Sequence, residues 1–226
     1  MKKHVPNLLT LVNLLCGSAG IIFVVEKGPE NGLVFIVIAG AFDFFDGLSA
    51  RLLKVKSAIG KELDSLADMV SFGALPAIIM YKMLQSANGP NWVSYAGLGL
   101  AAFAALRLAK FNVDERQTDV FFGLPTPAMA LFIGSLPFIG LIQNVEYLVA
   151  ITVLLSYLMI ADLELFALKF ASFGWKGNEV RFLFLGAGAL LVLTLKIAAV
   201  PIIICLYVIT SLFLKVLKGK QKHNTQ

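Results

Sequence analysis

The chain has 226 residues, of which 58% are hydrophobic and only 15% are charged, and its net charge is +5. Ordinary soluble domains carry roughly 45–50% apolar and about 25% charged residues, so this composition excludes a soluble globular domain and indicates a polytopic membrane protein. The positive charge is attributed to membrane topology and to attraction to lipid headgroups, and nucleic acid is not an expected partner.

Eight apolar segments are predicted to be transmembrane helices, because each is near the roughly 20 residues that a bilayer core requires. They cover residues 6–25, 31–53, 62–85, 92–113, 123–142, 145–162, 180–196 and 198–217. The first is predicted to be retained, since no small-residue cleavage site follows it. The segment 163–179 is too polar to span and is expected at the interface or in a loop. The fold class is therefore all-α, with residues 1–226 as a single membrane helix bundle.

Lysine and arginine are distributed unevenly over the two ends of these segments. With eight spans, both termini and the even-numbered connections share one side, and that side receives 16 of the 19 Lys and Arg residues. The other side receives only Lys27, Lys82 and Lys196. By the positive-inside rule, both termini are predicted to lie on the cytoplasmic side of a cell membrane.

Four aspartates stand where the second predicted span ends and the third begins. Asp43 and Asp46 are three residues apart, and Asp64 and Asp68 are four apart, so each pair shares one helix face. The short connection makes the two helices neighbours, and the pairs can face each other. Clustered carboxylates repel unless cations neutralise them, and two bridged divalent ions are a known device for holding phosphoryl groups. A structural ion-pair network is the alternative, but ionisable residues inside a membrane are functional by default.

The spacing of these residues resembles the signature of the CDP-alcohol phosphatidyltransferase family. The chain reads Asp43-x2-Asp46-Gly47-x2-Ala50-Arg51-x8-Gly60-x3-Asp64-x3-Asp68, which matches the signature at all eight fixed positions. The resemblance implies a site for a CDP-linked lipid or alcohol and for two divalent ions, Mg²⁺ or Mn²⁺.

The same resemblance implies a role for each signature residue. The metal ligands would be Asp43, Asp46, Asp64 and Asp68. Asp68 would also be the general base that accepts the proton of the incoming hydroxyl. The CDP-lipid would be bound by Gly47, Ala50 and Gly60, which line the cytidine pocket, and by Arg51, which contacts the phosphates.

Other stretches resemble the branch of the family that uses serine as its acceptor. These stretches are PNLLTLVNLLCGSAG, ELDSLADMVSFGALPA, ALRLAKFN and FGLPTPA, which lie between about residues 5 and 135. The resemblance implies CDP-diacylglycerol and L-serine as substrates, CMP and phosphatidylserine as products, and a homodimer in the membrane. Relatives with phosphate-bearing acceptors commonly carry an arginine where this chain has Asn13, which weakens the case for such an acceptor. The helices at about 180–217 would be an addition at the C-terminus.

Two groups of polar residues outside the signature have open interpretations. Arg107, Lys110 and Asn112 end the fourth span, where Arg107 can pair with the serine carboxylate; the alternative for Arg107 and Lys110 is positive-inside anchoring. Asn7 and Thr10 begin the first span and either contact the nucleotide or phosphates or cap the helix.

Three other functions are compatible with parts of this pattern. A sister enzyme would use the same donor with glycerol phosphate or inositol phosphate as the acceptor, and an archaeal-type enzyme would use an ether-linked donor. A divalent-cation transporter would line a path with the aspartates. The transporter hypothesis requires more acidic or polar residues deep in several spans, and the sequence offers few of them.

Overall fold

The computed structural model describes residues 4–55, 57–114, 121–140, 144–165, 174 and 178–223. Five helical segments are long and apolar enough to cross a membrane, namely Val5–Lys27, Pro29–Leu52, Ala58–Ser86, Asn91–Val113 and Glu179–Lys215. Two shorter apolar helical segments are Thr126–Phe138 and Val145–Ile160. The prediction of a polytopic membrane helix bundle is confirmed, whereas the number of crossings and the sidedness of the termini stay predictions.

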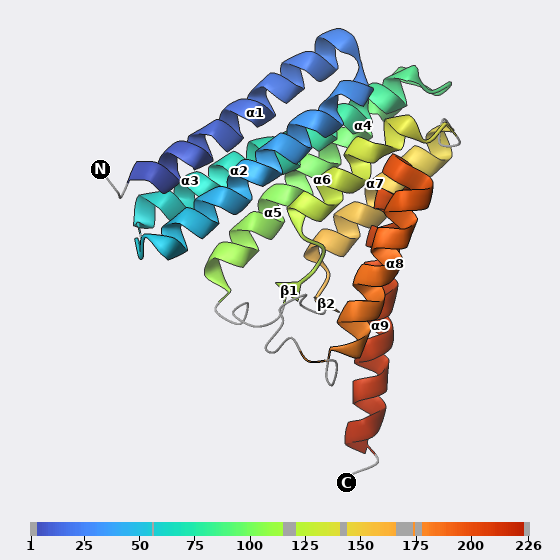
Figure 1. The fold of residues 1–226 in the computed structure, drawn as a ribbon. Coiled ribbons are helices and arrows are strands. Elements are labelled where there is room, and N and C mark those ends of the chain that lie inside the picture. The colour runs from blue at the N-terminus through green and yellow to red at the C-terminus, as the bar shows by residue number, and fades with distance from the viewer. Residues whose placement is uncertain are drawn as a thin grey trace.

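The helices run back and forth along the bundle in chain order (Figure 1). Those of the first half are α1 (Val5–Lys27), α2 (Gly32–Leu52), α3 (Ala58–Asp68), α4 (Leu75–Ser86) and α5 (Gly99–Val113). Those of the second half are α6 (Thr126–Ser135), α7 (Val145–Ile160), α8 (Glu179–Leu195) and α9 (Ala199–His223). The helix begun by α3 continues into α4 through a π-helical turn at Met69–Ala74. The N-terminus and the α2–α3 connection therefore lie at one end of the bundle, and the α1–α2 turn lies at the other (Figure 1).

The fifth predicted span is shorter in the structure than the expected 123–142. Pro125 precedes α6 with an extended backbone, and Pro137 lies in a single 3₁₀ turn, Leu136–Phe138, after which Ile139 is extended. Proline lacks the amide hydrogen that a helix interior needs, so the prolines bound this helix on both sides.

A pair of two-residue strands, which the sequence analysis did not predict, links the start of α6 to the end of α7. In this pair β1 (Phe121–Phe122) is antiparallel to β2 (Glu164–Leu165). The segment expected as a loop or interfacial stretch, 163–179, lies mostly outside the described residues.

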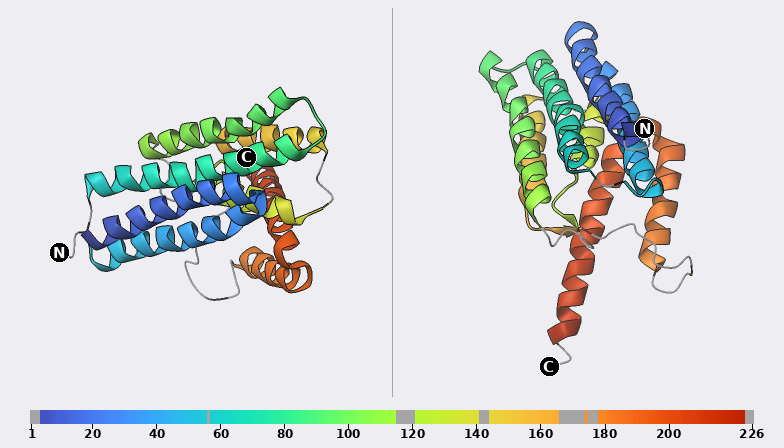
Figure 2. Two further views of the ribbon diagram at one scale, coloured as in Figure 1. Left: turned by 90° about the horizontal axis from the view of Figure 1, so that it is seen from above. Right: turned by 90° about the vertical axis from the view of Figure 1, so that its left-hand side faces the viewer.

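The last two predicted spans form a helical hairpin beside the bundle of α1 to α7. The chain breaks between α8 and α9 at a 3₁₀ turn that begins with Lys196, whose φ of 52° lies in the left-handed region. Figure 1 and the right-hand view of Figure 2 show α9 reaching away from the bundle toward the C-terminus. The predicted boundary near 196–199 therefore coincides with a real change of chain direction.

Small and polar residues form the buried face of α1. Thr10, Asn13, Gly17 and Gly20 are buried at helical spacing, whereas Leu15 on the other side is 66% exposed. A Cβ at Gly17 would lie 2.7 Å from the Cα of Ser71, so glycine permits the close approach of α1 to the π-helical turn. This approach brings the polar side of α1 against the aspartate-bearing helices.

Candidate active site

Three of the four signature aspartates meet between α2 and α3. Each of Asp43, Asp64 and Asp68 offers a carboxylate oxygen, and these oxygens all lie within 4.8 Å of one another. The helical spacing explains the arrangement, because residues four apart on α3 present both carboxylates toward the end of α2. We call these three residues the aspartate cluster.

The aspartate cluster fits divalent ions. Three carboxylates at this separation repel one another unless cations neutralise them, and carboxylate oxygens are the ligands that Mg²⁺ and Mn²⁺ favour. The Oδ1 atom of Asp64 is buried and has no hydrogen-bond partner among the described residues. A buried acceptor without a donor is costly, and a bound cation would satisfy it.

Asp46 lies beside the cluster but makes a different contact. Its Oδ2 atom accepts a hydrogen bond of 2.6 Å from the Thr10 hydroxyl, and both residues are buried. The hydroxyl has one proton, and its distance to the Pro6 carbonyl oxygen is longer, at 3.1 Å. Thr10 therefore fixes the orientation of Asp46 from α1.

A pocket of about 510 Å³, which we call the α1–α3 pocket, opens next to Asp46 and Asp64. It gathers five of the six residues that were predicted to bind the CDP-lipid: Asn7, Thr10, Gly47, Ala50 and Gly60. Neither Asn7 nor Thr10 caps α1, since His4 holds the N-cap position and no side chain makes a capping bond there. The capping interpretation of these two residues is therefore wrong in this structure.

The two signature glycines in this pocket leave room in different ways. A Cβ at Gly47 would meet no atom within 4 Å, so a larger side chain would extend into open space on a pocket wall. A Cβ at Gly60 would lie 3.0 Å from the Asn7 side-chain oxygen, so Gly60 lets α3 approach α1 closely. The sixth predicted residue, Arg51, is exposed and does not line the pocket, and its Nε donates to the Gly47 carbonyl oxygen at 3.0 Å.

A second pocket, of about 450 Å³, lies at the ends of α5 and α7 and shares no lining residue with the first. We call it the α5–α7 pocket. Arg107 lines it and is only 8% exposed, which is unlike an anchor that reaches lipid headgroups. One guanidinium nitrogen of Arg107 donates to the Thr126 hydroxyl at 3.3 Å, and its charge interacts with Asp68.

The Arg107 guanidinium keeps unused hydrogen-bonding capacity. Its Nε is buried without a partner among the described residues, although Phe111 offers an aromatic ring 5.8 Å from the guanidinium carbon. A planar cation with a free donor suits a carboxylate or phosphate, which it can contact through two parallel bonds.

The other two residues predicted to bind the acceptor are placed differently. Lys110 is exposed, lines the α5–α7 pocket, and its ammonium group lies 3.4 Å from the Ile160 carbonyl oxygen. Asn112 does not line that pocket, and its amide donates to the Ser65 hydroxyl at 2.8 Å. Of the three, Arg107 and Lys110 share the pocket, and Asn112 links α5 to α3.

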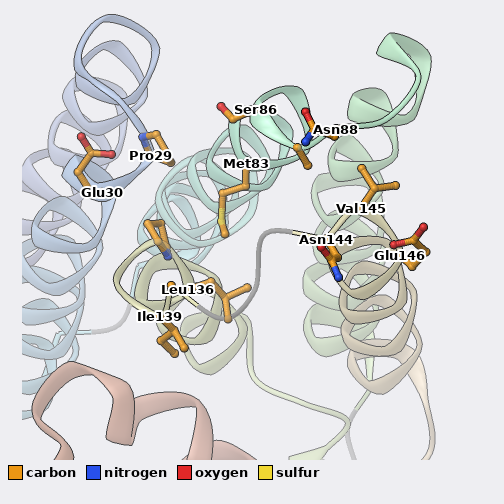
Figure 3. Close-up of a pocket in the computed structure, with 13 residues that line it drawn as sticks. Pro29, Glu30, Met83, Ser86, Asn88, Leu136, Ile139, Asn144, Val145 and Glu146 are labelled. Atoms are coloured by element: carbon orange, nitrogen blue, oxygen red, sulfur yellow. The ribbon is translucent and has the colours of Figure 1, made fainter.

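A third pocket, of about 670 Å³ and thus larger than the other two, lies at the opposite end of the bundle. Figure 3 shows Glu30 and Glu146 on separate walls, with Met83, Leu136 and Ile139 between them. None of the four signature aspartates lines it. Size therefore does not identify the site here, whereas the aspartate cluster does.

The structure also places at the site three residues without a role predicted from sequence, namely Asn13, Ser71 and Thr126. All three are fully buried, and Asn13 donates to Asp68 across 3.4 Å. Asn13 is three residues after Thr10 on the same helix face, so continuing the period of Asn7 and Thr10 would have found it. No local signal marks Thr126, because its contact with Arg107 joins residues 19 apart in sequence.

The chain was also compared with known proteins. Residues 3–162 match the family model described as CDP-alcohol phosphatidyltransferase, so α8 and α9 lie outside the match. Three similar proteins all carry the name CDP-diacylglycerol–serine O-phosphatidyltransferase.

The similarity to these three proteins is moderate and covers most of this chain. The protein from Bacillus subtilis is 32% identical over 162 residues, which cover 72% of this chain and 89% of the relative. The protein from Methanocaldococcus jannaschii is 31% identical over 71% of this chain and 72% of its own length. The protein from Mycobacterium leprae is 35% identical over 61% of this chain, and the match spans only 46% of that longer relative.

Proposed function

Because the chain belongs to the CDP-alcohol phosphatidyltransferase family, we propose that it synthesises phosphatidylserine by transferring the phosphatidyl group of CDP-diacylglycerol to L-serine. The observation that carries this proposal is the aspartate cluster together with two separate pockets. The α1–α3 pocket is lined by signature residues, and the α5–α7 pocket is lined by the buried Arg107. The names of the three relatives support the same donor and acceptor.

The α1–α3 pocket is the proposed site of the CDP group. Its small residues Gly47, Ala50 and Gly60 leave space for the cytidine, and Asn7 and Thr10 supply polar groups. We propose that Arg51 reaches the diphosphate by leaving the Gly47 carbonyl oxygen, a change of one exposed side chain. The acyl chains would remain in the bilayer.

Residues Asp43, Asp46, Asp64 and Asp68 would hold two divalent ions, Mg²⁺ or Mn²⁺, whose positive charge would offset that of the diphosphate. The serine oxygen attacks the phosphorus that carries the diacylglycerol, while Asp68 accepts the hydroxyl proton. The bond between that phosphorus and the CMP oxygen breaks, and CMP leaves with the electron pair. Catalysis then consists of positioning and charge stabilisation, as in other phosphoryl transfers.

The α5–α7 pocket is the proposed site of L-serine. The Arg107 guanidinium would pair with the serine carboxylate, and Lys110 would add positive charge at the rim. The proposed role of Asn112 is indirect, since its amide contacts Ser65 on the aspartate-bearing helix. The proposal requires the serine hydroxyl to reach Asp68, and the electrostatic interaction between Arg107 and Asp68 supports it.

A direct assay distinguishes this function from its rivals. Purified protein would receive CDP-diacylglycerol, Mg²⁺ or Mn²⁺, and radiolabelled L-serine, glycerol 3-phosphate or inositol phosphate in separate reactions. Of the three alcohols, we expect only serine to label the lipid and to release CMP. The ion that gives the higher activity identifies the metal in use. Lipid labelled by either phosphate-bearing alcohol, with none from serine, would refute the proposed acceptor. An ether-linked donor run in parallel tests the nature of the lipid chains, and metal flux without CMP release would indicate a transporter.

We also propose that the site faces the cytoplasm of a cell membrane and that the protein is a homodimer. The asymmetry of Lys and Arg residues supports the first proposal, and the family resemblance supports the second.

A further inference from the structure

The helix that carries Asp68 changes its winding directly after that residue. Met69–Ala74 is a π-helical turn, so each hydrogen bond there spans one more residue than in an α-helix. Ser71, Phe72 and Gly73 within it are all buried. Such turns are rare and often occur at functional sites, and the proposed chemistry assigns this one no role.

Contacts from α1 hold this turn at two points. The Ser71 hydroxyl donates to the backbone carbonyl oxygen of Asn13 at 2.9 Å, and the Asn13 amide nitrogen lies 3.4 Å from Asp68 Oδ1. One residue of α1 therefore contacts both the aspartate and the turn that follows it. Gly17, one helical turn further along α1, makes the approach possible, because its missing Cβ would touch the Ser71 hydroxyl oxygen.

Burial of the Asn13 side chain destabilises the fold more than a purely structural residue at this position would. Its side chain is fully buried, and its Oδ1 has no hydrogen-bond partner among the described residues. A buried carbonyl without a donor destabilises a fold by about 1–3 kcal/mol. A leucine of similar size would avoid that cost, so the amide donor toward Asp68 is the property that distinguishes asparagine here.

We propose that Asn13 and Ser71 are positioning residues that fix the π-helical turn and thereby the orientation of the Asp68 carboxylate. The inference rests on the proposed function for its kinetic consequence only. The contact with Asn13 engages one of the two Asp68 oxygens and leaves the other for the proposed chemistry. Neither residue needs to touch a substrate for this effect, and loss of either would leave the carboxylate free to rotate.

The test uses the full chain with N13L, S71A and the double variant. S135A is the matched control, because Ser135 is equally buried and also donates to a backbone carbonyl oxygen, that of Phe132, at 2.7 Å. This hydrogen bond lies away from the site. We expect kcat to fall about 10- to 100-fold in N13L, since small misplacements of reacting groups have effects of that size. The KM values for both substrates should change less than threefold. The decrease in kcat should be smaller in S71A than in N13L, and the kcat of the double variant should be no lower than that of N13L.

A second measurement does not depend on activity. Hydrogen exchange followed by mass spectrometry should show faster exchange of the 69–74 amides in N13L and S71A, and unchanged exchange there in S135A. The thermal midpoint of N13L should equal or exceed that of the unaltered protein. Unchanged exchange at 69–74, or a rise in KM with kcat preserved, would overturn the inference. Failure of the unaltered protein to label lipid from serine would instead refute the proposed function, and the exchange result would still decide the role of Asn13.

Discussion

Asp68 interacts with residues from several parts of the candidate site. Its carboxylate belongs to the aspartate cluster, its Oδ1 atom accepts the hydrogen bond from Asn13, and its charge interacts with Arg107. A group in this position can serve both as a metal ligand and as the proposed base. Its substitution should therefore affect the chemical step more than the binding of the lipid.

The variant D68N tests this role. We expect the rate of transfer to fall about 10²- to 10⁴-fold, the usual contribution of a general base, and to stay low when the metal concentration is raised. The measurement is CMP release together with direct binding of CDP-diacylglycerol, which should persist. E62Q is the control, because Glu62 is an exposed acid on the same helix. A near-normal rate of transfer by D68N would show that Asp68 is not the general base.

The variant R107A tests the acceptor site. Loss of a charged pair that accounts for roughly 1.5–3 kcal/mol should raise the KM for serine about 10- to 100-fold. The KM for CDP-diacylglycerol should stay nearly constant, and R107K should recover only part of the loss because lysine lacks the planar fork. R181A in α8, outside the family match, is the control. An equal rise in both KM values would contradict the separation of the two pockets.

At the scale of elements, α1 determines how closely the other helices approach one another. Its buried face is built from small and polar residues, so it can lie against both α2 and the π-helical turn. Its opposite face is apolar and exposed to the surroundings of the bundle. The helix thus holds Asp46 through Thr10 and Asp68 through Asn13.

Added bulk on that face should separate α1 from the π-helical turn. G17A should destabilise the protein by about 1–3 kcal/mol, as expected for overpacking in a well-packed interior. G99A is the matched control, because a Cβ at Gly99 would meet nothing within 4 Å. Thermal unfolding in detergent measures both variants. Equal midpoints for the two would show that α1 does not pack tightly at Gly17.

The sequence predicted the helices better than the contacts between them. Apolar length identifies each helical segment, and local spacing places Asp64 and Asp68 on one face. The π-helical turn, the contact of Thr126 with Arg107 and the bond from Asn112 to Ser65 were not predictable in this way. Each depends on how helices distant in sequence pack, and a single sequence carries no local signal of that packing.

At the scale of the whole molecule, charged side chains occur at both ends of the bundle, but the aspartate cluster and the far pocket are separate. Arg51 lies in the last turn of α2 and Lys61 near the start of α3, and the connection between these helices is at the end that holds the N-terminus (Figure 1). Lys110 lies in the last turn of α5. The far pocket shown in Figure 3 belongs to the other end. Which end faces the cytoplasm stays a prediction from the lysine and arginine distribution.

Sidedness can be measured directly. Epitope tags at the two termini should both be cleaved by protease in inside-out vesicles and protected in right-side-out vesicles. The reason is that the positive-inside rule places both on the cytoplasmic side. A tag inserted after Asn88, at the other end of the bundle, should show the reverse pattern. Opposite behaviour of the two terminal tags would mean that the number of crossings is odd.

The α1–α3 and α5–α7 pockets share no lining residue, and under the proposed assignment of donor and acceptor this separation has a stereochemical consequence. In that proposal donor and acceptor are bound at the same time, so no protein side chain has to carry the phosphatidyl group between two half-reactions. A single in-line displacement inverts the configuration at phosphorus, whereas two successive displacements would retain it. A donor made chiral at that phosphorus should therefore yield product of inverted configuration, with kinetics that require both substrates to bind before CMP is released.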